Sequence, residues 1–457
     1  MLIVSIPDYC QSQITYSLNV LLKYFLGLDF IISDKVSSCI EIRCQSSIKV
    51  LSVDVSFFSG AVDNWLKSDS LPLLPLRSWK PQDDNLRAKL VNEELPILYG
   101  KGLIVDDGDY VQIGIDIFGS AFFMLSRYEE LVVQDRDNHG RFAGTSSLAY
   151  KANFLDRPII NEYLEVLWFS MSRLWPALDR KKRTASIRVS CDVDDPFDSL
   201  VNKPLGLFKT ALMDVIKRRD IILAFKRVLN AIIAPLKIYK LDPYNTFDWY
   251  MDACERNGLK ATFYFIVNHS AGKIDGEYSI QEQRIQQLIK RIISRGHNVG
   301  VHGSYNTYRD GGMIAYEKQQ FDKFVIACNK YAKPIGIRQH YLRVDYSVTQ
   351  DYFERAGYSY DTTGGYADVP GFRFGVCYSF PMWSWLEGRQ INLIQRPLIV
   401  MEVAAFSLYP PSEVLYKLNI LKANCYKFNG DFSLLWHNSQ FYSNRFSIFP
   451  KIISTRG

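Results

Sequence analysis

The segment CDVDDP carries the residues in this sequence most able to do chemistry: Asp192, Asp194 and Asp195. The preceding run ASIRVS is typical of a β-strand, in which alternate side chains point to the same face, so Asp192 and Asp194 share a face. Such a pair suits metal-assisted hydrolysis, because one carboxylate can hold a divalent cation while the other takes a proton from the attacking water. An Asp-rich turn that caps the next helix explains the motif equally well.

Imidazole and guanidinium groups follow other strand-like runs. His302 ends NVGVH and His437 closes the apolar run FSLLWH, so each could bring an imidazole to the carboxylates, although a lone histidine is more often structural. In GIRQHYLR, Arg338 and Arg343 flank His340. An arginine at a strand end could keep a catalytic carboxylate ionised and oriented through a bidentate pair, whereas the alternative is a surface arginine.

Strand-like and helix-like segments alternate in the part of the chain that must position these groups. The sequence predicts strands in IRVS, ATFYFIV, NVGVH and GIRQ, with helices over 246–257 and 280–295 between them. This alternation predicts βα units and a parallel sheet or barrel, whose active site lies at the carboxyl ends of the strands. The polar motifs fall at those ends.

The length of 457 residues favours two domains, because one hydrophobic core seldom organises so long a chain. Residues 1–183 hold the strand-like runs LIVSIP, IEIRC and IKVLSV and helices near 116–130 and 161–175, which predict an α/β domain without a nucleotide-binding loop. The charged stretch DRKKRT predicts a linker, so we place the boundary near residue 183 and the second domain at 184–457.

A basic, amphipathic insertion at about 200–240 interrupts the βα units. A helical hairpin that covers the barrel with a solvated face is favoured over docking to a membrane surface.

Composition excludes several functional classes. The net charge of +6 is spread along the chain without the block of like charges that is typical of a nucleic-acid-binding arm. The N-terminus lacks the features of a secretory signal, and no apolar run reaches the roughly 18 residues of a membrane span. We therefore expect a cytoplasmic protein without a transmembrane segment that does not bind nucleic acid. The eight cysteines include no CxxC pair and are expected to be free thiols.

The order of the motifs resembles the NodB-like polysaccharide deacetylases, carbohydrate esterase family four. The resemblance covers about 186–438, through a strand ending in D-x-D, the pattern G-H-x-x-G-x-H, an Arg-bearing strand end and an apolar strand ending in His. The segments SCDVDDPFD, GHNVGVHGSYNTYRD, RQHYLR, RPLIVMEV and LLWHN look like a bacterial branch of that family, often found with surface-polysaccharide genes, in which an uncharacterised α/β domain precedes the barrel. The implied fold is α/β: a distorted (β/α) barrel of about seven strands behind a smaller α/β domain.

The resemblance also implies roles for individual residues. The catalytic residues would be Asp192 as general base, Arg338 as the residue that orients it and His437 as general acid. The metal would be held by Asp194, His302 and Asn306. The family has a second histidine where this chain has Asn306, and an amide oxygen is a poorer ligand for zinc, so a harder metal or a nearby group such as Asp195 or His340 could complete the site.

The same resemblance implies the cofactor and the partner. The cofactor would be a divalent metal, with zinc expected first and cobalt, nickel or manganese as alternatives. The partner would be an N-acetylated sugar or glycan, which could be lipid-linked and would place the protein at the inner face of the membrane. The residues expected to bind this substrate are Tyr305, His340 and Arg343.

Three functions follow from these expectations. The first is removal of an N-acetyl group from a sugar during biosynthesis of a bacterial surface polysaccharide, such as O-antigen, capsule or exopolysaccharide. The second is a catalytically degenerate deacetylase fold that binds a glycan or a partner enzyme, which Asn306 favours. The third is hydrolysis of an ester or another C–N bond on the same scaffold.

Overall fold

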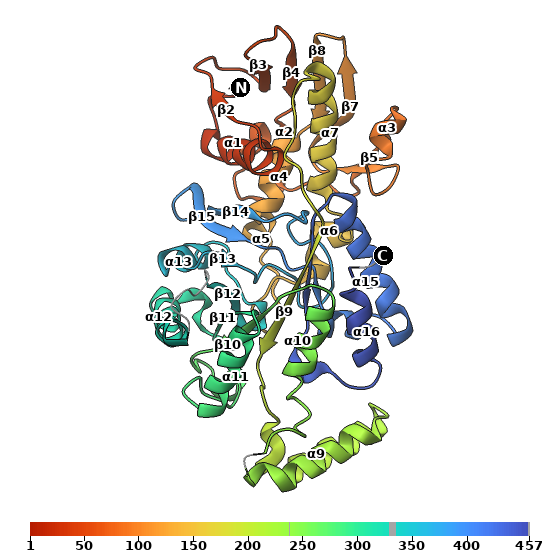
Figure 1. Cartoon of the computed structure of the whole chain (residues 1–457). Helices are drawn as coiled ribbons and strands as arrows, with labels where there is room; N and C mark the ends of the chain where they lie inside the picture. The colour runs from red at the N-terminus through yellow and green to blue at the C-terminus, as the bar shows by residue number, and fades with distance from the viewer. Residues whose placement is uncertain (237, 329–334, 456–457) are drawn as a thin grey trace.

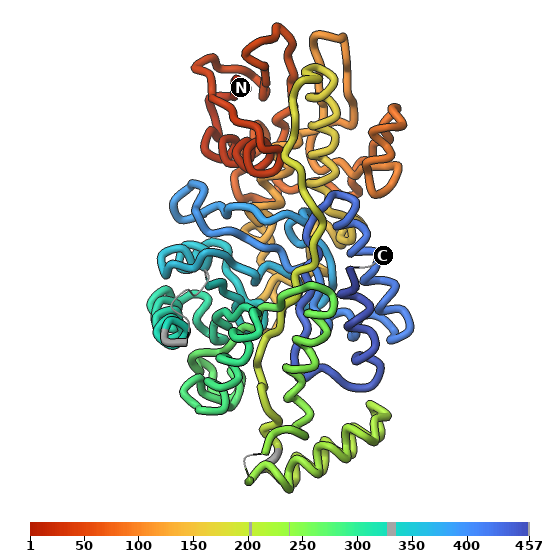
Figure 2. The backbone as a smooth tube through the Cα atoms, in the orientation of Figure 1, coloured from red at the N-terminus to blue at the C-terminus, as the bar shows by residue number. Residues whose placement is uncertain are grey.

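Figure 1 shows the computed structural model of the chain, which describes residues 1–236, 238–328 and 335–455. Lys237 of the basic insertion lies outside the described residues. The strands form a six-stranded sheet before residue 116, a nine-stranded sheet from residue 186 onward and a two-stranded ribbon. Figure 2 shows the same division along the chain, with the N-terminal part at one end and the larger sheet beyond it.

The N-terminal sheet has the order β2-β1-β3-β4-β8-β7 and mixes parallel and antiparallel pairs. Its strands are β1 (Leu2–Ser5), β2 (Phe30–Ile32), β3 (Ile40–Cys44), β4 (Val50–Val53), β7 (Gly100–Asp106) and β8 (Tyr110–Ile115), beside the ribbon of β5 (Arg77–Trp79) and β6 (Leu95–Ile97). The helical segments of this part are α1 (Gln11–Leu18), η1 (Asn19–Leu26), α2 (Ser56–Ala61), η2 (Ser68–Ser70), α3 (Asp84–Arg87), α4 (Ile117–Leu125), α5 (Tyr128–Val132), η3 (Gly144–Ser146), α6 (Leu148–Lys151) and α7 (Ile159–Leu174).

The helix predicted near 116–130 is two helices in the structure, α4 and α5. Arg127 between them adopts φ of 58°, a left-handed conformation that a continuous right-handed helix cannot contain. The predicted helix near 161–175 corresponds to α7, and the predicted strands LIVSIP, IEIRC and IKVLSV correspond to β1, β3 and β4.

The larger sheet has the order β14-β15-β13-β12-β11-β10-β9-β17-β16, and every pair is parallel except the edge pair β14 and β15. The strands are β9 (Ser186–Val193), β10 (Ala261–Ile266), β11 (Asn298–Gly303), β12 (Gly336–Gln339), β13 (Tyr360–Asp361), β14 (Phe380–Ser384), β15 (Arg389–Gln395), β16 (Val400–Met401) and β17 (Asp431–Leu435). Central strands such as β10 are buried almost throughout, as expected for a parallel sheet with both faces covered.

Helices follow the strands and cover the outside of this sheet. They are α10 (Phe247–Arg256), α11 (Gln283–Ser294), α12 (Gly311–Cys328), α13 (Thr349–Arg355), α14 (Glu402–Leu408), α15 (Pro411–Lys427) and α16 (Arg445–Ile452). In α11 the buried residues Ile285, Leu288, Ile289 and Ile292 recur at helical spacing and form the face that packs on the sheet. The insertion after β9 consists of η4 (Ser199–Asn202), α8 (Pro204–Ile216), α9 (Ile221–Ile233) and η5 (Ala234–Leu236).

The nine-stranded sheet is curled into an open barrel. β15 and β16 lie near opposite ends of the strand order, yet the chain passes from Gln395 to Val400 between them. An extended connection of this length bridges at most about 18 Å, so the two edges of the sheet lie close together. The predicted fold class, a barrel of the (β/α) type behind a smaller α/β part, is confirmed, with more strands than the seven expected.

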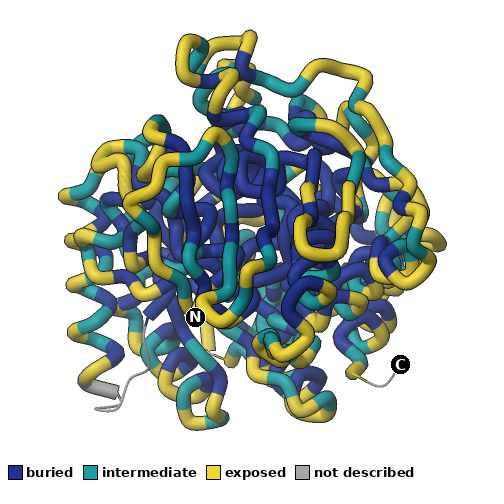
Figure 3. The backbone as a smooth tube through the Cα atoms, turned by 90° about the horizontal axis from the view of Figure 1, so that it is seen from above, coloured by how far each residue is buried: buried dark blue, intermediate teal, exposed yellow. Residues whose placement is uncertain are grey.

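The two parts of the chain share one continuous hydrophobic core. The ring of Phe122 in α4 lies 5.2 Å from that of Trp383 in β14, and the hydroxyl of Tyr16 donates to the carbonyl of Pro381. Figure 3 shows the buried segments gathered in the centre of the molecule. The boundary near residue 183 stays a prediction, because the N-terminal part does not have a separate core.

A buried ion network also joins the two parts. Glu130 of α5 accepts hydrogen bonds from Arg127 and from Arg373, with Arg373 Nη2 2.6 Å from Glu130 Oε2. All three side chains are at least nine-tenths buried. We expect Glu130→Ala to lower the free energy of unfolding by about 3–5 kcal/mol, because it takes the counter-charge from the buried Arg373 and leaves Arg127 with Glu129 alone.

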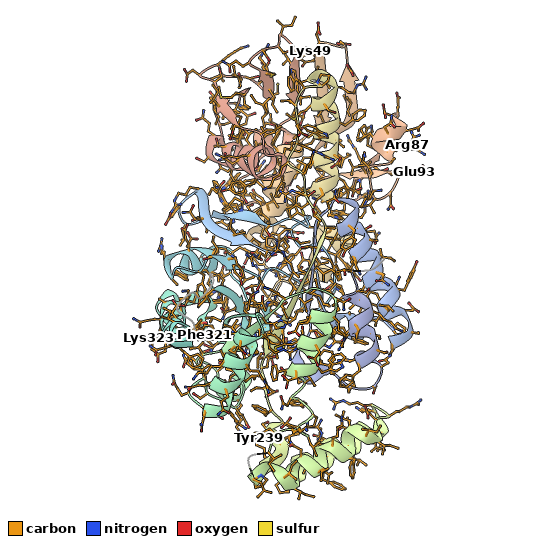
Figure 4. The ribbon with its side chains drawn as sticks, viewed as in Figure 1. Lys49, Arg87, Glu93, Tyr239, Phe321 and Lys323 are labelled. Carbon is orange, nitrogen blue, oxygen red and sulfur yellow. The ribbon has the colours of Figure 1, made fainter. Side chains whose placement is uncertain are left out.

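Urea denaturation measures this loss. Glu93→Ala is the matched control, since Glu93 pairs with Lys80 at the exposed surface (Figure 4). We expect the control to unfold as the unmodified chain does. Equal midpoints for the Glu130 variant and the unmodified chain would contradict the role of the network.

Candidate metal centre and active site

The candidate site lies at the carboxyl ends of the parallel strands. Asp192 lies near the end of β9, His302 is in β11 and Arg338 is in β12, while Asp194 and His340 directly follow β9 and β12. His302 and Arg338 are register partners on adjacent strands. Because parallel strands end at one edge of a sheet, residues far apart in the sequence meet there.

Asp194, His302 and His340 form a group that could hold a metal ion. One ligand atom from each residue lies within 4.8 Å of the others. Oδ1 of Asp194 lies 3.2 Å from Nε2 of His302 and 3.7 Å from Nε2 of His340. Two histidines and one carboxylate with a remaining open position are a common ligand set for catalytic zinc.

The acceptors around the two histidines determine their tautomers. Nδ1 of His302 lies 2.7 Å from the carbonyl oxygen of Arg338, which can only accept, so Nδ1 carries the proton. Nδ1 of His340 lies 2.9 Å from Oδ1 of Asp275. Burial raises the pKa of Asp275, but hydrogen bonds from His340 and from backbone N–H groups outweigh burial and lower it, so this carboxylate also accepts. Both Nε2 atoms therefore keep lone pairs that face Asp194.

These facing acceptors fit a cation. Oδ1 of Asp194 is a buried atom that lacks a hydrogen-bond partner among the described residues. Burial raises the pKa of Asp194, but the imidazoles of His340, His302 and His437 outweigh burial and hold it well below its usual range. Conversely, burial lowers the pKa of His302, and the carboxylates of Asp192 and Asp194 outweigh burial and raise it. The site thus favours positive charge between Asp194 and the two imidazoles.

Asp192 lies beside this group and is held by different neighbours. It is buried, with Oδ2 3.7 Å from Nε2 of His302 and Oδ1 3.6 Å from Nε of Arg338. Arg338 donates its hydrogen bonds to Ser190 and Thr362, so it forms an ion pair with Asp192 and not the bidentate hydrogen bond expected from the sequence. Oδ1 of Asp192, which faces Arg338, is buried and lacks a hydrogen-bond partner among the residues described, while Oδ2 faces His302.

His437 lies near the second carboxylate oxygen of Asp194. Its Nε2 lies 3.6 Å from Oδ2 of Asp194, and its Nδ1 lies 2.6 Å from Oε1 of Glu402, the first residue of α14. Burial lowers the pKa of His437, but the Glu402 carboxylate outweighs burial and raises it to about 10. At neutral pH this imidazole is therefore protonated on both nitrogens and can give up a proton from Nε2.

Asn306 lies outside the group of facing acceptors. Its amide donates to the carbonyl of Ser270 and accepts from Nη1 of Arg343, and the residue is exposed. The structure therefore places the imidazole of His340 beside Asp194, while the Asn306 amide is engaged elsewhere. His340, expected from the sequence to bind substrate or to complete the metal site, lies among the candidate ligands.

Tyr305 and Arg343 lie at the rim of the site. The Arg343 guanidinium is 3.9 Å from the centre of the Tyr305 ring and donates to the Tyr305 carbonyl oxygen, so it holds the loop after β11. The N-terminal part reaches the same rim: Nδ1 of His139 lies 3.0 Å from the Tyr305 hydroxyl, and Arg141 donates to the carbonyl of Tyr341.

The sequence analysis missed two residues that position the others, Asp275 and Glu402. Asp275 ends the short turn η6 (Gly272–Asp275). The next residue, Gly276, has φ of 80° and lies close to the backbone of Asp194. A Cβ at Gly276 would lie 2.5 Å from the Asp194 carbonyl oxygen, so glycine is required there. Glu402 lies in the segment RPLIVMEV, at the end of the two-residue strand β16.

Comparisons with known proteins cover the two parts of the chain separately. Residues 2–176 match the model of a family of unknown function, DUF7033. No curated protein matches the chain. Among the described residues, no helix is both long and apolar enough to cross a membrane.

Three solved structures show similarity to about three-fifths of the chain. The first is a protein described as a polysaccharide deacetylase from Mycobacterium smegmatis, with 14% identity and a TM-score of 0.35 over 61% of this chain and 84% of that one. The second is the chitin deacetylase of Colletotrichum lindemuthianum, with 12% identity and a TM-score of 0.32 over 60% of this chain and 80% of that one. The third is the Xyl-CE4 domain of a xylanase from the hindgut metagenome of Trinervitermes trinervoides, with 12% identity and a TM-score of 0.28 over 60% of this chain and 82% of that one. At these identities and TM-scores the similarity carries no argument about function, which rests on the geometry of the site.

The geometry predicts that zinc binding depends on His340 and not on Asn306. We expect His340→Ala to weaken zinc binding by about 100-fold or more, and Asp275→Asn, which removes the negative charge of the group that accepts from His340, to weaken it by about 10–100-fold. Isothermal titration of the metal-free protein with zinc measures both effects. Asn306→Ala is the matched control, and we expect its affinity to be unchanged. The reverse pattern, with zinc lost in the Asn306 variant alone, would make Asn306 a ligand.

Proposed function

We propose that this chain is a metal-dependent hydrolase that removes an N-acetyl group from a sugar. The observation that carries the proposal is the arrangement around Asp194: two imidazole lone pairs and a carboxylate that favour a cation, with Asp192 beside His302 and a protonated His437 beside Asp194. A hydrolase of amides needs a base for water, an acid for the leaving amine and stabilisation of the developing oxyanion.

Each role falls to a residue with the matching surroundings. Asp192 is the general base, because its Oδ2 faces His302 of the candidate ligand group, and Arg338 positions it through the ion pair with Oδ1 at 3.6 Å. His437 is the general acid, because the Glu402 carboxylate keeps it protonated at neutral pH. Asp192 lies beside His302 and His437 lies beside Asp194, so a base for water and an acid for the leaving amine would both be next to the proposed metal ligands.

The proposed metal ligands are Asp194, His302 and His340. Lewis-acid polarisation of the acyl carbonyl is the chemistry that a divalent ion supplies when bound there. Zinc is proposed first, since two imidazoles and one carboxylate suit it, and cobalt, nickel and manganese are the alternatives.

The sugar substrate is proposed from the sequence motifs together with the site. The motif order resembles a bacterial branch of deacetylases associated with surface polysaccharides, and this supports a substrate from the biosynthesis of O-antigen, capsule or exopolysaccharide. Asn306 was the feature that favoured a degenerate binding module. Since His340 is available as a ligand in its place, that alternative loses its main support.

Acetate release tests the proposal directly. The purified chain, loaded with zinc, cobalt, nickel or manganese, is given a panel of N-acetylated and O-acetylated sugars. We expect metal-dependent release of acetate from N-acetylated members. If O-acetylated members alone react, the enzyme is an esterase, and if zinc binds but no sugar yields acetate, the proposed substrate class is wrong.

The base is tested by Asp192→Asn. We expect kcat to fall by about 100–10,000-fold, because general-base catalysis is lost while the zinc affinity is retained. Asp248→Asn, on the exposed side of α10, is the control and should keep the full rate. A variant that keeps near-normal kcat would remove Asp192 from this role.

The acid is tested by the pH dependence of kcat in Glu402→Gln. The pKa of His437 is raised to about 10 by Glu402, so the unmodified enzyme keeps its acid up to that pH and loses activity as pH rises through it. Without the charge of Glu402 this pKa falls, and we expect the alkaline limb to move down by about 1–3 pH units. The control Glu413→Gln changes an exposed carboxylate of α15 and should leave the limb in place. An unmoved limb in Glu402→Gln would assign it to another group.

A further inference from the structure

Helices α8 and α9 project from the end of the molecule opposite the N-terminal sheet (Figure 1). They come soon after Asp194 in the sequence and pack against each other as a hairpin. A cavity of about 380 Å³ lies at the base of this hairpin and is lined by Asp195, Phe197 and Tyr239, among others. Tyr239, labelled in Figure 4, marks this base below the barrel. The hairpin therefore stands on the same side of the barrel as the candidate site.

The hairpin buries polar residues and exposes apolar ones, the reverse of an ordinary surface helix. Asp214, Arg227 and Asn230 are fully buried. Arg227 pairs with Asp214 and Asp198, and Asn230 donates to Asp242, so the face toward the protein is a hydrogen-bonded ion network. These contacts hold both helices in one orientation.

Large apolar side chains are exposed along both helices of the hairpin. Its most exposed large side chains are each at least 66% exposed, and they are Leu205, Phe208, Ile221, Ile222, Phe225 and Ile232. Large exposed apolar patches on a protein mark a surface that contacts another protein or a membrane. Two adjacent helices with Phe, Ile and Leu outward match the composition of amphipathic helices that lie in a membrane interface.

The charges around this surface decide between these partners. Lys209, Lys217, Arg219 and Lys226 are exposed on the two helices and the turn between them. The acidic residues of the same segment are Asp214, which is buried with Arg227, and Asp220, which accepts from the backbone N–H groups of Leu223 and Ser443. The exposed basic side chains of the hairpin therefore give it a cationic surface, which complements anionic lipid headgroups.

We propose that the outward face of α8 and α9 docks on an anionic lipid bilayer. The apolar side chains enter the boundary between headgroups and acyl chains, and the lysines and arginine contact lipid phosphates. This docking does not require the proposed enzymatic activity. If that activity holds, docking brings the site and the neighbouring cavity to a substrate carried by the membrane, such as a lipid-linked N-acetylated saccharide.

Sedimentation with sucrose-loaded vesicles tests the docking. The probes are vesicles of phosphatidylcholine alone and of phosphatidylcholine with phosphatidylglycerol, and neither contains a saccharide. We expect the full chain to sediment with the anionic vesicles and far less with the neutral ones, with binding that weakens as salt is added. A chain that stays in the supernatant with anionic vesicles at low salt would overturn the proposal.

Two sets of variants separate the apolar and the charged contributions. We expect the triple variant Ile222→Glu, Phe225→Glu and Ile232→Glu, and separately Lys209→Glu with Lys217→Glu and Lys226→Glu, each to weaken vesicle binding by at least about tenfold. The matched control is Ile48→Glu with Leu73→Glu, which changes side chains that are 84% and 88% exposed in the N-terminal part. Equal loss of binding in this control would overturn the proposal.

A second copy of the chain is the other partner that could cover an apolar face. The oligomeric state distinguishes this case from membrane docking. Light scattering after size exclusion is expected to give the same mass for the full chain and for the triple apolar variant. A dimer of the full chain that the triple variant breaks, without binding to vesicles, would show that a second copy covers this face. Acetate release from a soluble substrate is measured on the same variants and should be unchanged, so a failure of docking is distinguishable from a failure of the proposed activity.

Discussion

Two buried hydrogen bonds, from Nδ1 of His302 to the Arg338 carbonyl and from Nδ1 of His340 to Asp275, are the interactions on which the rest of the site depends. They fix the proton of each ring on the side away from Asp194, so three acceptor atoms face one another. A cluster of acceptors is stable only with a positive charge at its centre. The site therefore favours a cation because of the hydrogen bonds of the two Nδ1 atoms, and not because of the ligand atoms alone.

The parallel sheet explains why several residues of the site could be predicted from the sequence. The carboxyl ends of β9, β11, β12 and β17 carry Asp192, His302, Arg338 and His437 within or close after short apolar runs, so their convergence follows from strand order. Asp275 and Glu402 could not be found this way. Asp275 ends a turn within a long loop and Glu402 follows a strand of two residues, so neither has a local pattern that points to the site. The choice between Asn306 and His340 depends on side-chain direction, which spacing does not determine.

The α/β character of the N-terminal part was predictable from its alternating runs, but its relation to the barrel was not. The polar segment with His139 and Arg141 is a loop by composition, and its contacts are with Tyr305 and Tyr341, more than 160 residues later in the chain. The buried pairing of Glu130 with Arg373 likewise joins residues separated by 243 positions. Through these contacts and the shared core, the N-terminal part forms a wall of the site's rim. A change of sequence there therefore acts on the rim of the candidate site as well as on stability.

The hairpin shows the limit of reading amphipathic helices from sequence. Apolar residues at helical spacing ordinarily form a face turned inward, and the sequence analysis favoured a hairpin that covers the barrel with a solvated face. The structure turns that face outward, because Asp198 and Asp242 at the base of the hairpin draw Arg227 and Asn230 inward. Burying this polar face would cost free energy without those partners. The buried ion network therefore explains why the apolar face is exposed. Asp214 of α8 together with Asp198 and Asp242, which lie outside the two helices, decides which face meets the solvent, so the periodicity of the helices alone does not determine it.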